Sequence, residues 1–430
     1  MRIEEILDLE ILSNSQKKVL WIARISWAFV AMEIIIISFT LPFLSSEFKL
    51  NELQVGFLAS AVLLGDIVGA IIFGRFSDKI GRRPLFQVSL IWYSIFTALT
   101  ALSNSYYELF AFRFLAGIGL GGMLVIDPAL LSEFLPARKR GRLMVSLDLF
   151  WPFGSIIALG LSFLFLEIYN SWRILFLAAA FPAFTIGVFR LFVPESPFFL
   201  AKTGKINEAL KVLEKLTGKN IEVNQIEFAI EEKGTYSELF MKYLIRVIVM
   251  LTAWIALNYT YYGFFLWLPS TLEILKLYPN IWIFLIIAFL FQVPGYVSAM
   301  YLVEILGRKK TLTIYLFLSG VTGITMALTT HDWLLFTISM LLVSFFNLGA
   351  WGSVYPFTSE LFPTKLRGKA FGLAEGIGKI AAVLGPVIFG LILTVFNNVI
   401  YPLIVTMALA IIASIIILIF APETKKLIFD

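Results

Sequence analysis

Seven ionisable residues fall inside long apolar stretches of this chain, where a charge is costly. They are Glu33, Asp66, Arg113, Asp127, Asp148, Glu375 and Lys379. A charged side chain inside a membrane-crossing helix costs roughly 2.5–3.5 kcal/mol on insertion scales, so each needs a partner or a function. An acid and a guanidinium that approach each other suit one chemistry, the reversible binding of a proton. Burial disfavours the ionised carboxylate, whereas a nearby guanidinium favours it.

An internal repeat helps to sort these charges. Three loop motifs recur at one offset, to within a single residue, and such a repeat predicts a duplicated half-molecule. In the longest motif the serine, glutamate, proline, second arginine and glycine all recur in register. The repeated pairs are Ser132–Arg142 with Ser359–Lys369, Gly81–Arg83 with Gly307–Lys309, and Pro194–Ser196 with Pro422–Thr424.

The same offset shows which charges lack a counterpart in the other half. Glu33 corresponds to Thr260 and Arg113 to Met340, so neither charge is needed merely to build one half. We therefore predict that Glu33 and Arg113 have a function beyond building one half, and the reversible binding of a proton is the chemistry that such a pair suits. The alternative is a permanent buried ion pair that fixes helix packing. Asp127 follows Arg113 by almost four helical turns on the same face. It is a candidate second proton site, or else a packing partner of the loop arginines.

The elements that must position these residues are membrane-crossing helices. The chain has 430 residues, of which 59% are hydrophobic and 15% are charged, whereas about 25% are charged in soluble proteins. Its apolar runs approach the length that crosses a hydrocarbon core of roughly 30 Å. We predict an all-α membrane protein with twelve transmembrane helices in two pseudo-symmetric six-helix bundles. The spans lie near 20–44, 53–74, 85–103, 107–131, 143–166, 173–193, 242–269, 280–303, 311–329, 333–357, 369–393 and 399–421.

Five segments follow from these spans and from the polar stretches between them. A short amphipathic helix is expected at Lys205–Leu216, within the linker. The segments are a cytoplasmic N-terminal stretch (1–19), a first bundle (20–193), a cytoplasmic linker (194–241), a second bundle (242–421) and a cytoplasmic tail (422–430).

Lysine and arginine gather in every second loop, which places those loops and both termini in the cytoplasm. The net charge of +5 does not indicate a nucleic-acid partner, because the basic residues lie in short loops rather than on one folded face. With no cysteine there is no thiolate metal site. The sequence offers no metal cluster, catalytic triad or cofactor loop, so we predict neither an enzyme nor a bound cofactor or metal.

Acidic residues accompany the basic loops at matched positions. This pattern predicts ion pairs that break and re-form as the protein changes conformation, with Glu133 facing Arg140 and Glu360 facing Arg367. The alternative is that the basic residues only set topology. The residues assigned to gating are Asp78, Arg82, Arg83, Glu133, Arg140, Glu304, Arg308, Glu360 and Arg367.

Several motifs resemble those of the major facilitator superfamily. Gly74–Arg83 is similar to its signature between the second and third spans, and Arg113–Gly122 to its fourth-span signature. Within the superfamily the chain resembles niacin and aromatic-acid proton symporters and related organic-ion transporters. The matching segments are Trp27–Glu33, Asn258–Pro269 and Gly349–Gly352. The resemblance implies transport by alternating access and an acid of the first span facing the fourth-span arginine.

The resemblance also points to substrate-binding residues. Lys379 lies where organic-anion carriers have an arginine, although Glu375, four residues earlier, could simply pair with it. Glu375 itself corresponds to Asp148 and so belongs to the duplicated fold. Gly263 and Pro269 are predicted to interrupt the seventh span, among aromatic residues suited to a flat ring. The substrate-binding candidates are Lys379, Asn258, Tyr262, Trp351, Trp151 and Glu375.

These observations predict a monomeric secondary transporter in the cytoplasmic membrane. Its expected partners are the lipid bilayer, a small organic anion such as an aromatic carboxylate, and protons. A sugar transporter is the alternative, because Pro194–Ser196 and the repeated glutamate–arginine loops are also shared with sugar porters. The chain lacks the Gln-Leu-Ser of their fifth span and the paired glutamines of their seventh.

Overall fold

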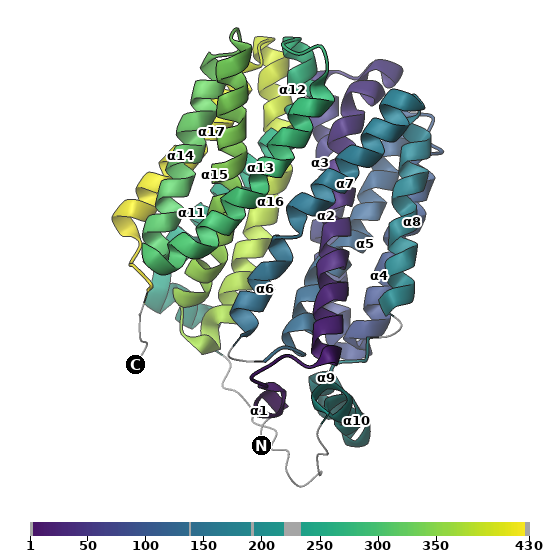
Figure 1. The fold of residues 1–430 in the computed structure, drawn as a ribbon, viewed down its shortest axis with the longest axis vertical. Coiled ribbons are helices and arrows are strands. Elements are labelled where there is room, and N and C mark those ends of the chain that lie inside the picture. The colour runs from purple at the N-terminus through teal and green to yellow at the C-terminus, as the bar shows by residue number, and fades with distance from the viewer. Residues whose placement is uncertain (1–2, 137–138, 191–192, 219–233, 426–430) are drawn as a thin grey trace. The chain divides into compact units, whose positions relative to one another are not determined.

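The computed structural model describes residues 3–136, 139–190, 193–218 and 234–425. All regular structure in this part is helical, as predicted (Figure 1). Within it, ten stretches are long and apolar enough to cross a membrane. They are α2 (Asn14–Phe48), α3 (Glu52–Ile80), α5 (Tyr106–Ser132), the stretch Ser146–Ile168, α11 (Tyr236–Phe265), α13 (Ile281–Ile305), α14 (Arg308–Leu328), α15 (Trp333–Glu360), α16 (Thr364–Phe396) and α17 (Ile400–Phe420).

The other two predicted spans coincide with α4 and α8. Helix α4 (Arg82–Thr100) begins with two arginines and contains several polar residues, which lowers its mean hydropathy. Helix α8 spans Trp172–Arg190, and its stretch Trp172–Phe181 is apolar but short. Both helices lie where the sequence predicts a span. Each of the twelve predicted spans therefore has a helix in the described part of the chain.

The fifth predicted span is a broken helix rather than a continuous one. Helix α6 (Arg140–Asp148) ends at a turn, α7 (Trp151–Ser162) follows, and the π-helix η1 (Phe163–Ile168) completes the span. Pro152 is the second residue of α7. A proline has no backbone N–H and its fixed backbone angle suits the first turn of a helix, so a helix restarts readily at this point.

The seventh span breaks at Pro269, as predicted, but not at Gly263. Helix α11 continues through Gly263 and ends at Phe265, and α12 (Leu268–Leu275) has Pro269 in its first turn. The expected interruption at Gly263 is therefore wrong. A Cβ at Gly385 of α16 would lie 2.8 Å from the Tyr259 carbonyl oxygen and 3.0 Å from the Gly263 backbone nitrogen, so glycine at position 385 permits α11 and α16 to cross closely.

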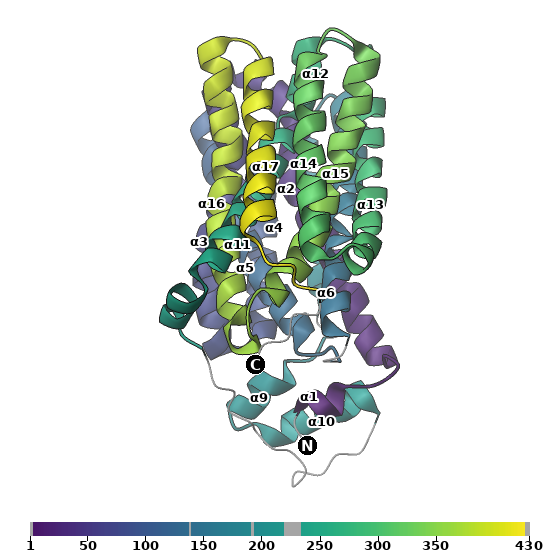
Figure 2. The ribbon, with the colours of Figure 1, turned by 90° about the vertical axis from the view of Figure 1, so that its left-hand side faces the viewer.

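The helices form two compact units. The first comprises Met1–Ile34, Leu64–Gly154 and Ser171–Glu231, and the second comprises Ile35–Leu63, Ser155–Asn170 and Glu232–Asp430. In the first unit, α4 packs along α5 and α8. Helices α1 (Ile3–Leu7) and α10 (Ile206–Thr217) lie side by side, and their apolar residues join a core with the start of α2 and the end of α5 (Figure 2). Between α8 and α10 lies the short α9 (Pro197–Lys202).

The second unit is built on α11, which packs along α16 and α17, while α15 packs against α13 and α14. It also includes the end of α2 and the start of α3. Phe39 of α2 packs edge-on against Phe289 of α13, with ring centroids 5.9 Å apart. The Ser60 hydroxyl of α3 donates a hydrogen bond to the Val383 carbonyl of α16, over 2.8 Å. Parts of the chain remote in sequence thus share one core.

Candidate functional site

The Glu33 carboxylate of α2 lies against the Arg113 guanidinium of α5 inside the first unit. Nη1 of Arg113 is 2.5 Å from Oε1 of Glu33, and both side chains are 0% exposed. Nη2 of Arg113 donates to the Glu33 backbone carbonyl over 2.9 Å. The arginine therefore holds both the backbone and the side chain of the acid. A pair so fully removed from solvent is costly to separate, because either partner left alone is an uncompensated buried charge.

Neighbouring helices complete the surroundings of this pair. Thr97 of α4 donates its hydroxyl hydrogen to Oε1 of Glu33 over 2.7 Å. The Phe176 ring of α8 lies 5.1 Å from the guanidinium carbon of Arg113, so the cation rests on an aromatic face. A Cβ at Gly119 of α5 would lie 2.7 Å from the backbone nitrogen of Tyr93, which shows how closely α4 and α5 pack. The close packing of α4 and α5 holds Thr97 and Arg113, the two donors to Oε1 of Glu33, in place.

Asp127 is not among the residues that contact Glu33 or Arg113 in the described structure. It is buried on α5, 1% exposed, directly before Pro128. The almost four helical turns between Arg113 and Asp127 correspond to about 21 Å along the helix. A role as a second proton site thus requires proton movement along α5, and it remains a prediction.

The repeated loop motifs form two equivalent clusters, one in each unit. Gly81 and Gly307 precede α4 and α14 with φ of 114° and 101°. A positive φ of this size is a backbone conformation that favours glycine over residues with a side chain. A Cβ at Gly81 would also lie 2.5 Å from the Glu195 carboxylate, and one at Gly307 would meet the Glu423 carboxylate. The repeated glycine is therefore required both by backbone conformation and by space.

Those two carboxylates accept hydrogen bonds from the first backbone N–H groups of α4 and α14. Glu195 accepts from Arg82 and Arg83 over 3.2 and 3.1 Å, and Glu423 accepts from Arg308 over 2.8 Å. An acid at a helix start satisfies free N–H groups and opposes the helix dipole. Burial favours the neutral form of Glu423, yet the backbone N–H groups of Lys425, Arg308, Lys309 and Lys310 outweigh it and lower the pKa of its carboxyl.

The arginines of the same clusters reach a second acid. Arg82 lies 3.2 Å from Glu133, and Arg308 lies 2.9 Å from Glu360. Burial raises the pKa of Glu133, against the opposing effects of Ser196 and Arg82. Arg308 also pairs with Glu304 over 3.0 Å, one helical turn earlier. Each cluster thus joins the start of one helix to the end of another.

The predicted pairing of Glu360 with Arg367 is wrong. Arg367 lies in the first turn of α16 and donates to the Phe362 carbonyl over 3.2 Å, because that carbonyl, close to the end of α15, is nearer than the acid. The side chains of Arg140 and Asp78 lie outside the described residues, so the pairing of Glu133 with Arg140 stays a prediction. The gating role of the whole set likewise stays a prediction.

Replacing Arg308 by alanine is expected to destabilise the protein more than replacing Arg367. Among the described residues, Arg308 contacts two acids and the Val303 carbonyl, whereas Arg367 makes one backbone contact. Hydrogen bonds to charged groups contribute about 1.5–3 kcal/mol each in favourable cases. Arg308→Ala should lower the thermal unfolding midpoint in detergent and change the rate of substrate exchange, with Arg367→Ala close to the wild type. Equal effects of the two variants would contradict this assignment.

Two of the predicted substrate-binding residues, Asn258 and Lys379, lie on α11 and α16, which pack along each other in the second unit. Asn258 of α11 is 4% exposed and donates its amide to the Trp254 carbonyl over 2.9 Å. A Cβ at Gly378 of α16 would lie 2.6 Å from that amide nitrogen, so Asn258 faces the residue before Lys379. On the same helix Lys379 is half-buried, whereas Glu375, one turn earlier, is exposed.

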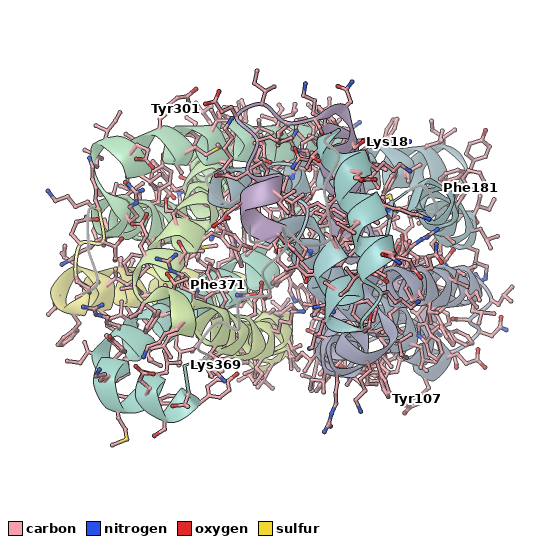
Figure 3. All side chains as sticks on the ribbon, turned by 90° about the horizontal axis from the view of Figure 1, so that it is seen from below. Lys18, Tyr107, Phe181, Tyr301, Lys369 and Phe371 are labelled. Carbon is pink, nitrogen blue, oxygen red and sulfur yellow. The ribbon has the colours of Figure 1, made fainter. Side chains whose placement is uncertain are left out.

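Aromatic rings surround this position. Trp254 packs edge-on against Trp351, Tyr355 and Phe371, with ring centroids 5.4–6.2 Å apart. Phe371 is on α16, near the end of the molecule viewed in Figure 3. The half-buried Tyr262 packs edge-on against Tyr261, whose ring centroid is 6.4 Å from that of Trp351. Trp151 is in the first unit, where its ring lies 6.4 Å from that of Trp27.

Sequence reasoning missed several of these neighbours. Glu195 and Glu423 were within the repeated motifs but were not assigned to gating, although acids at helix starts are a recognisable signal. Trp254 precedes Asn258 by one helical turn, which could have placed it on the same face. Thr97 carried no such signal, because its role depends on how α4 meets α2.

Comparisons with known proteins agree with this architecture. Residues 23–430 match the family described as sugar (and other) transporters. A niacin transporter of Acinetobacter baylyi is 32% identical over 417 residues, covering 94% of this chain and 94% of that protein. A Bacillus subtilis protein named for niacin and nicotinamide transport is 32% identical over 416 residues, and the match covers 96% of this chain and 97% of the Bacillus subtilis protein.

A solved structure shares the fold. The xylose transporter XylE of E. coli, in a partially occluded inward open conformation, superposes with a TM-score of 0.79 at 20% identity. The superposition covers 97% of this chain and 100% of that chain. Together with the family match it confirms the predicted twelve-helix fold.

Proposed function

Since the chain belongs to the sugar (and other) transporter family of the major facilitator superfamily, we propose that it moves a small organic anion together with protons. It is a multi-pass membrane transporter, and its relatives are transporters rather than enzymes. The anion is an aromatic or similar carboxylate, and alternating access carries it across the cell membrane.

Proton coupling rests on one observation, the Glu33–Arg113 pair that is fully buried in the first unit. Thr260, at the position equivalent to Glu33, is hydrogen-bonded instead to the Asn347 amide over 3.0 Å. A neutral contact therefore suffices to pack the second half, and the charged one serves another purpose. As an acid beside a cation, Glu33 can bind a proton when the pair is disturbed and release it when the pair re-forms.

The substrate class is supported by the residues on α11 and α16 and by the relatives' names. Lys379 provides a cation for a carboxylate, and Asn258 provides a polar side chain. Trp254 and Trp351 provide flat apolar faces for a ring. Niacin, which the Acinetobacter baylyi relative transports, has this chemistry.

Orientation and assembly form part of the same proposal. The basic loops place both termini in the cytoplasm. Residues 20–193 and 242–421 act as the two moving bundles, joined by the linker 194–241, and the loop clusters around Arg82 and Arg308 open and close in step with them. A monomer suffices, because every residue assigned to coupling and binding belongs to one chain.

Binding can be tested with purified protein in detergent. Nicotinate and benzoate are expected to raise the thermal unfolding midpoint, because a ligand that binds only the folded state stabilises it. Glucose and galactonate serve as comparisons, one neutral and one a non-aromatic anion. Stabilisation by glucose but not by nicotinate or benzoate would favour the sugar transporter and overturn the anion proposal.

Lys379→Gln is expected to weaken anion uptake, whereas Lys379→Arg should retain most of it. A hydrogen bond to a charged group contributes about 1.5–3 kcal/mol, so the KM for the anion should rise roughly ten- to a hundredfold. The matched control is Lys205→Gln, which removes an exposed lysine paired with Glu208 in the linker. An unchanged KM in Lys379→Gln would mean that Glu375 already neutralises the lysine.

A further inference from the structure

Gln292 lies near the middle of α13, and its side-chain amide is buried and unpaired. The residue is 0% exposed, and neither Nε2 nor Oε1 makes a hydrogen bond with any residue that the structure describes. A primary amide has two N–H donors and a carbonyl acceptor. Leaving buried donors and acceptors without partners destabilises the folded state. Leucine has a similar size and would avoid that cost, so packing alone does not account for glutamine here.

The other buried amide side chains in the described part of the chain all have partners. Gln16 and Asn258 donate to backbone carbonyls over 3.0 and 2.9 Å, and Asn347 of α15 donates to the Thr260 hydroxyl over 3.0 Å. Buried amides that serve packing are therefore satisfied in this fold. Gln292 differs from them, which indicates that its partner is a molecule that the protein binds.

The turn of α13 before Gln292 leads to Trp351, one of the substrate-binding candidates. The Phe289 ring lies 5.7 Å from that of Phe265 on α11, between ring centroids. Phe265 in turn lies 4.7 Å from Tyr261, whose ring is 6.4 Å from that of Trp351. A row of rings thus connects α13, next to Gln292, with the candidate site.

The turn of α13 after Gln292 leads to the same place. A Cβ at Gly352 would lie 3.5 Å from the Tyr296 carbonyl oxygen and 3.7 Å from Cδ1 of its ring, and Gly352 directly follows the half-buried Trp351. Phe289, Gln292 and Tyr296 are spaced by three and four residues, so they share one face of α13. Gln292 therefore lies between two residues that both adjoin the surroundings of Trp351.

We propose that Gln292 determines substrate specificity by donating a hydrogen bond from Nε2 to a ring nitrogen of the substrate. This inference rests on the proposed function and narrows its substrate class to heteroaromatic carboxylates such as nicotinate. The ring nitrogen of such a molecule is an acceptor in the plane of the ring. When Trp351 contacts the ring face and Lys379 the carboxylate, that nitrogen needs a further donor. A neutral amide supplies the donor without adding a second charge.

Benzoate has the same carboxylate on a ring of similar size, but it lacks the nitrogen. Bound benzoate would leave the Gln292 amide buried and unpaired. A site built to hydrogen-bond a ligand group disfavours the analogue that lacks this group. Lys379 interacts with both carboxylates alike, so the preference for nicotinate over benzoate depends on Gln292.

The test is the binding of nicotinate and benzoate to full-length protein in detergent, measured from the concentration of each that raises the thermal unfolding midpoint. Wild type is expected to bind nicotinate about tenfold more tightly than benzoate. Gln292→Leu should bind nicotinate about as weakly as benzoate, and Gln292→Met, with an unbranched side chain, should do the same. Lys379→Gln is the matched comparison, because it should weaken both anions by a similar factor.

Stability without ligand separates this role from packing. Gln292→Leu removes unpaired polar groups, so its unfolding midpoint should equal or exceed that of wild type. Asn347→Leu is the control, and its midpoint should fall because the Thr260 hydroxyl loses its donor. A glutamine that only packs the helix would give a lower midpoint and an unchanged ligand preference.

The outcomes separate this inference from the proposed function. A preference for nicotinate that persists in both Gln292 variants would overturn the inference, because the amide would then bind water only or serve packing. Equal weakening of nicotinate and benzoate in these variants would overturn the assignment of the ring nitrogen. If neither anion raises the midpoint of the wild type, the proposed function is contradicted and the inference with it.

Discussion

Glu33→Gln is expected to abolish proton-driven accumulation of the anion while exchange of anion for anion continues. Glutamine has the same shape and keeps an oxygen that can accept the hydrogen bonds of Arg113 and Thr97, but it cannot bind a proton at neutral pH. With a gradient of one pH unit and one proton per anion, the wild type should accumulate substrate up to about tenfold, and the variant about onefold.

The measurement is accumulation and counterflow of labelled nicotinate in liposomes with an imposed pH gradient. Glu273→Gln is the matched control, since it makes the same chemical change at an exposed acid of α12, outside the buried pair. It should accumulate substrate as the wild type does. A Glu33→Gln variant that still concentrates substrate would remove Glu33 from the coupling role.

Arg113→Met is expected to uncouple transport and to destabilise the protein. Methionine is the residue at the equivalent position of the second half, Met340, so a helix of this fold accommodates it. Without the guanidinium, Glu33 would be a buried carboxylate supported only by Thr97, and such a group becomes neutral rather than remaining charged. Breaking a buried pair by removing one partner costs about 3–5 kcal/mol in soluble proteins.

Accumulation in Arg113→Met should fall to about that of Glu33→Gln, and exchange should lose its dependence on pH. The double variant Glu33→Gln with Arg113→Met provides the control for stability. It contains no buried charge at this position, so its thermal unfolding midpoint should exceed that of Arg113→Met alone, while accumulation stays absent. A single variant as stable and as well coupled as the wild type would show that the pair matters for neither.

The sequence was sufficient for the parts of the fold that follow from composition and repetition. Apolar runs and loop motifs predicted the helices, because membrane crossing constrains both length and composition. The missing counterparts of Glu33 and Arg113 in the second half singled out the pair that the structure places in contact. That inference needed only the offset of the repeat and the energetic cost of buried charge.

Contacts that depend on helix ends could not be predicted in the same way. Glu360, the last residue of α15, contacts Arg308 of α14, whereas Arg367 in the first turn of α16 contacts the Phe362 carbonyl. Helix α11 continues through Gly263, where its backbone packs against Gly385, more than a hundred residues later in the sequence. Such contacts are set by packing between helices, for which local patterns give no signal.

The most direct test of proton coupling is the pH change that accompanies substrate movement. Liposomes containing the wild-type protein, in weakly buffered medium without an imposed gradient, should alkalinise the medium when nicotinate is added, because protons enter with the anion. Liposomes containing Glu33→Gln should not. If the medium stays at constant pH while labelled nicotinate enters the wild-type liposomes, transport is uncoupled and the role assigned to Glu33 and Arg113 is contradicted.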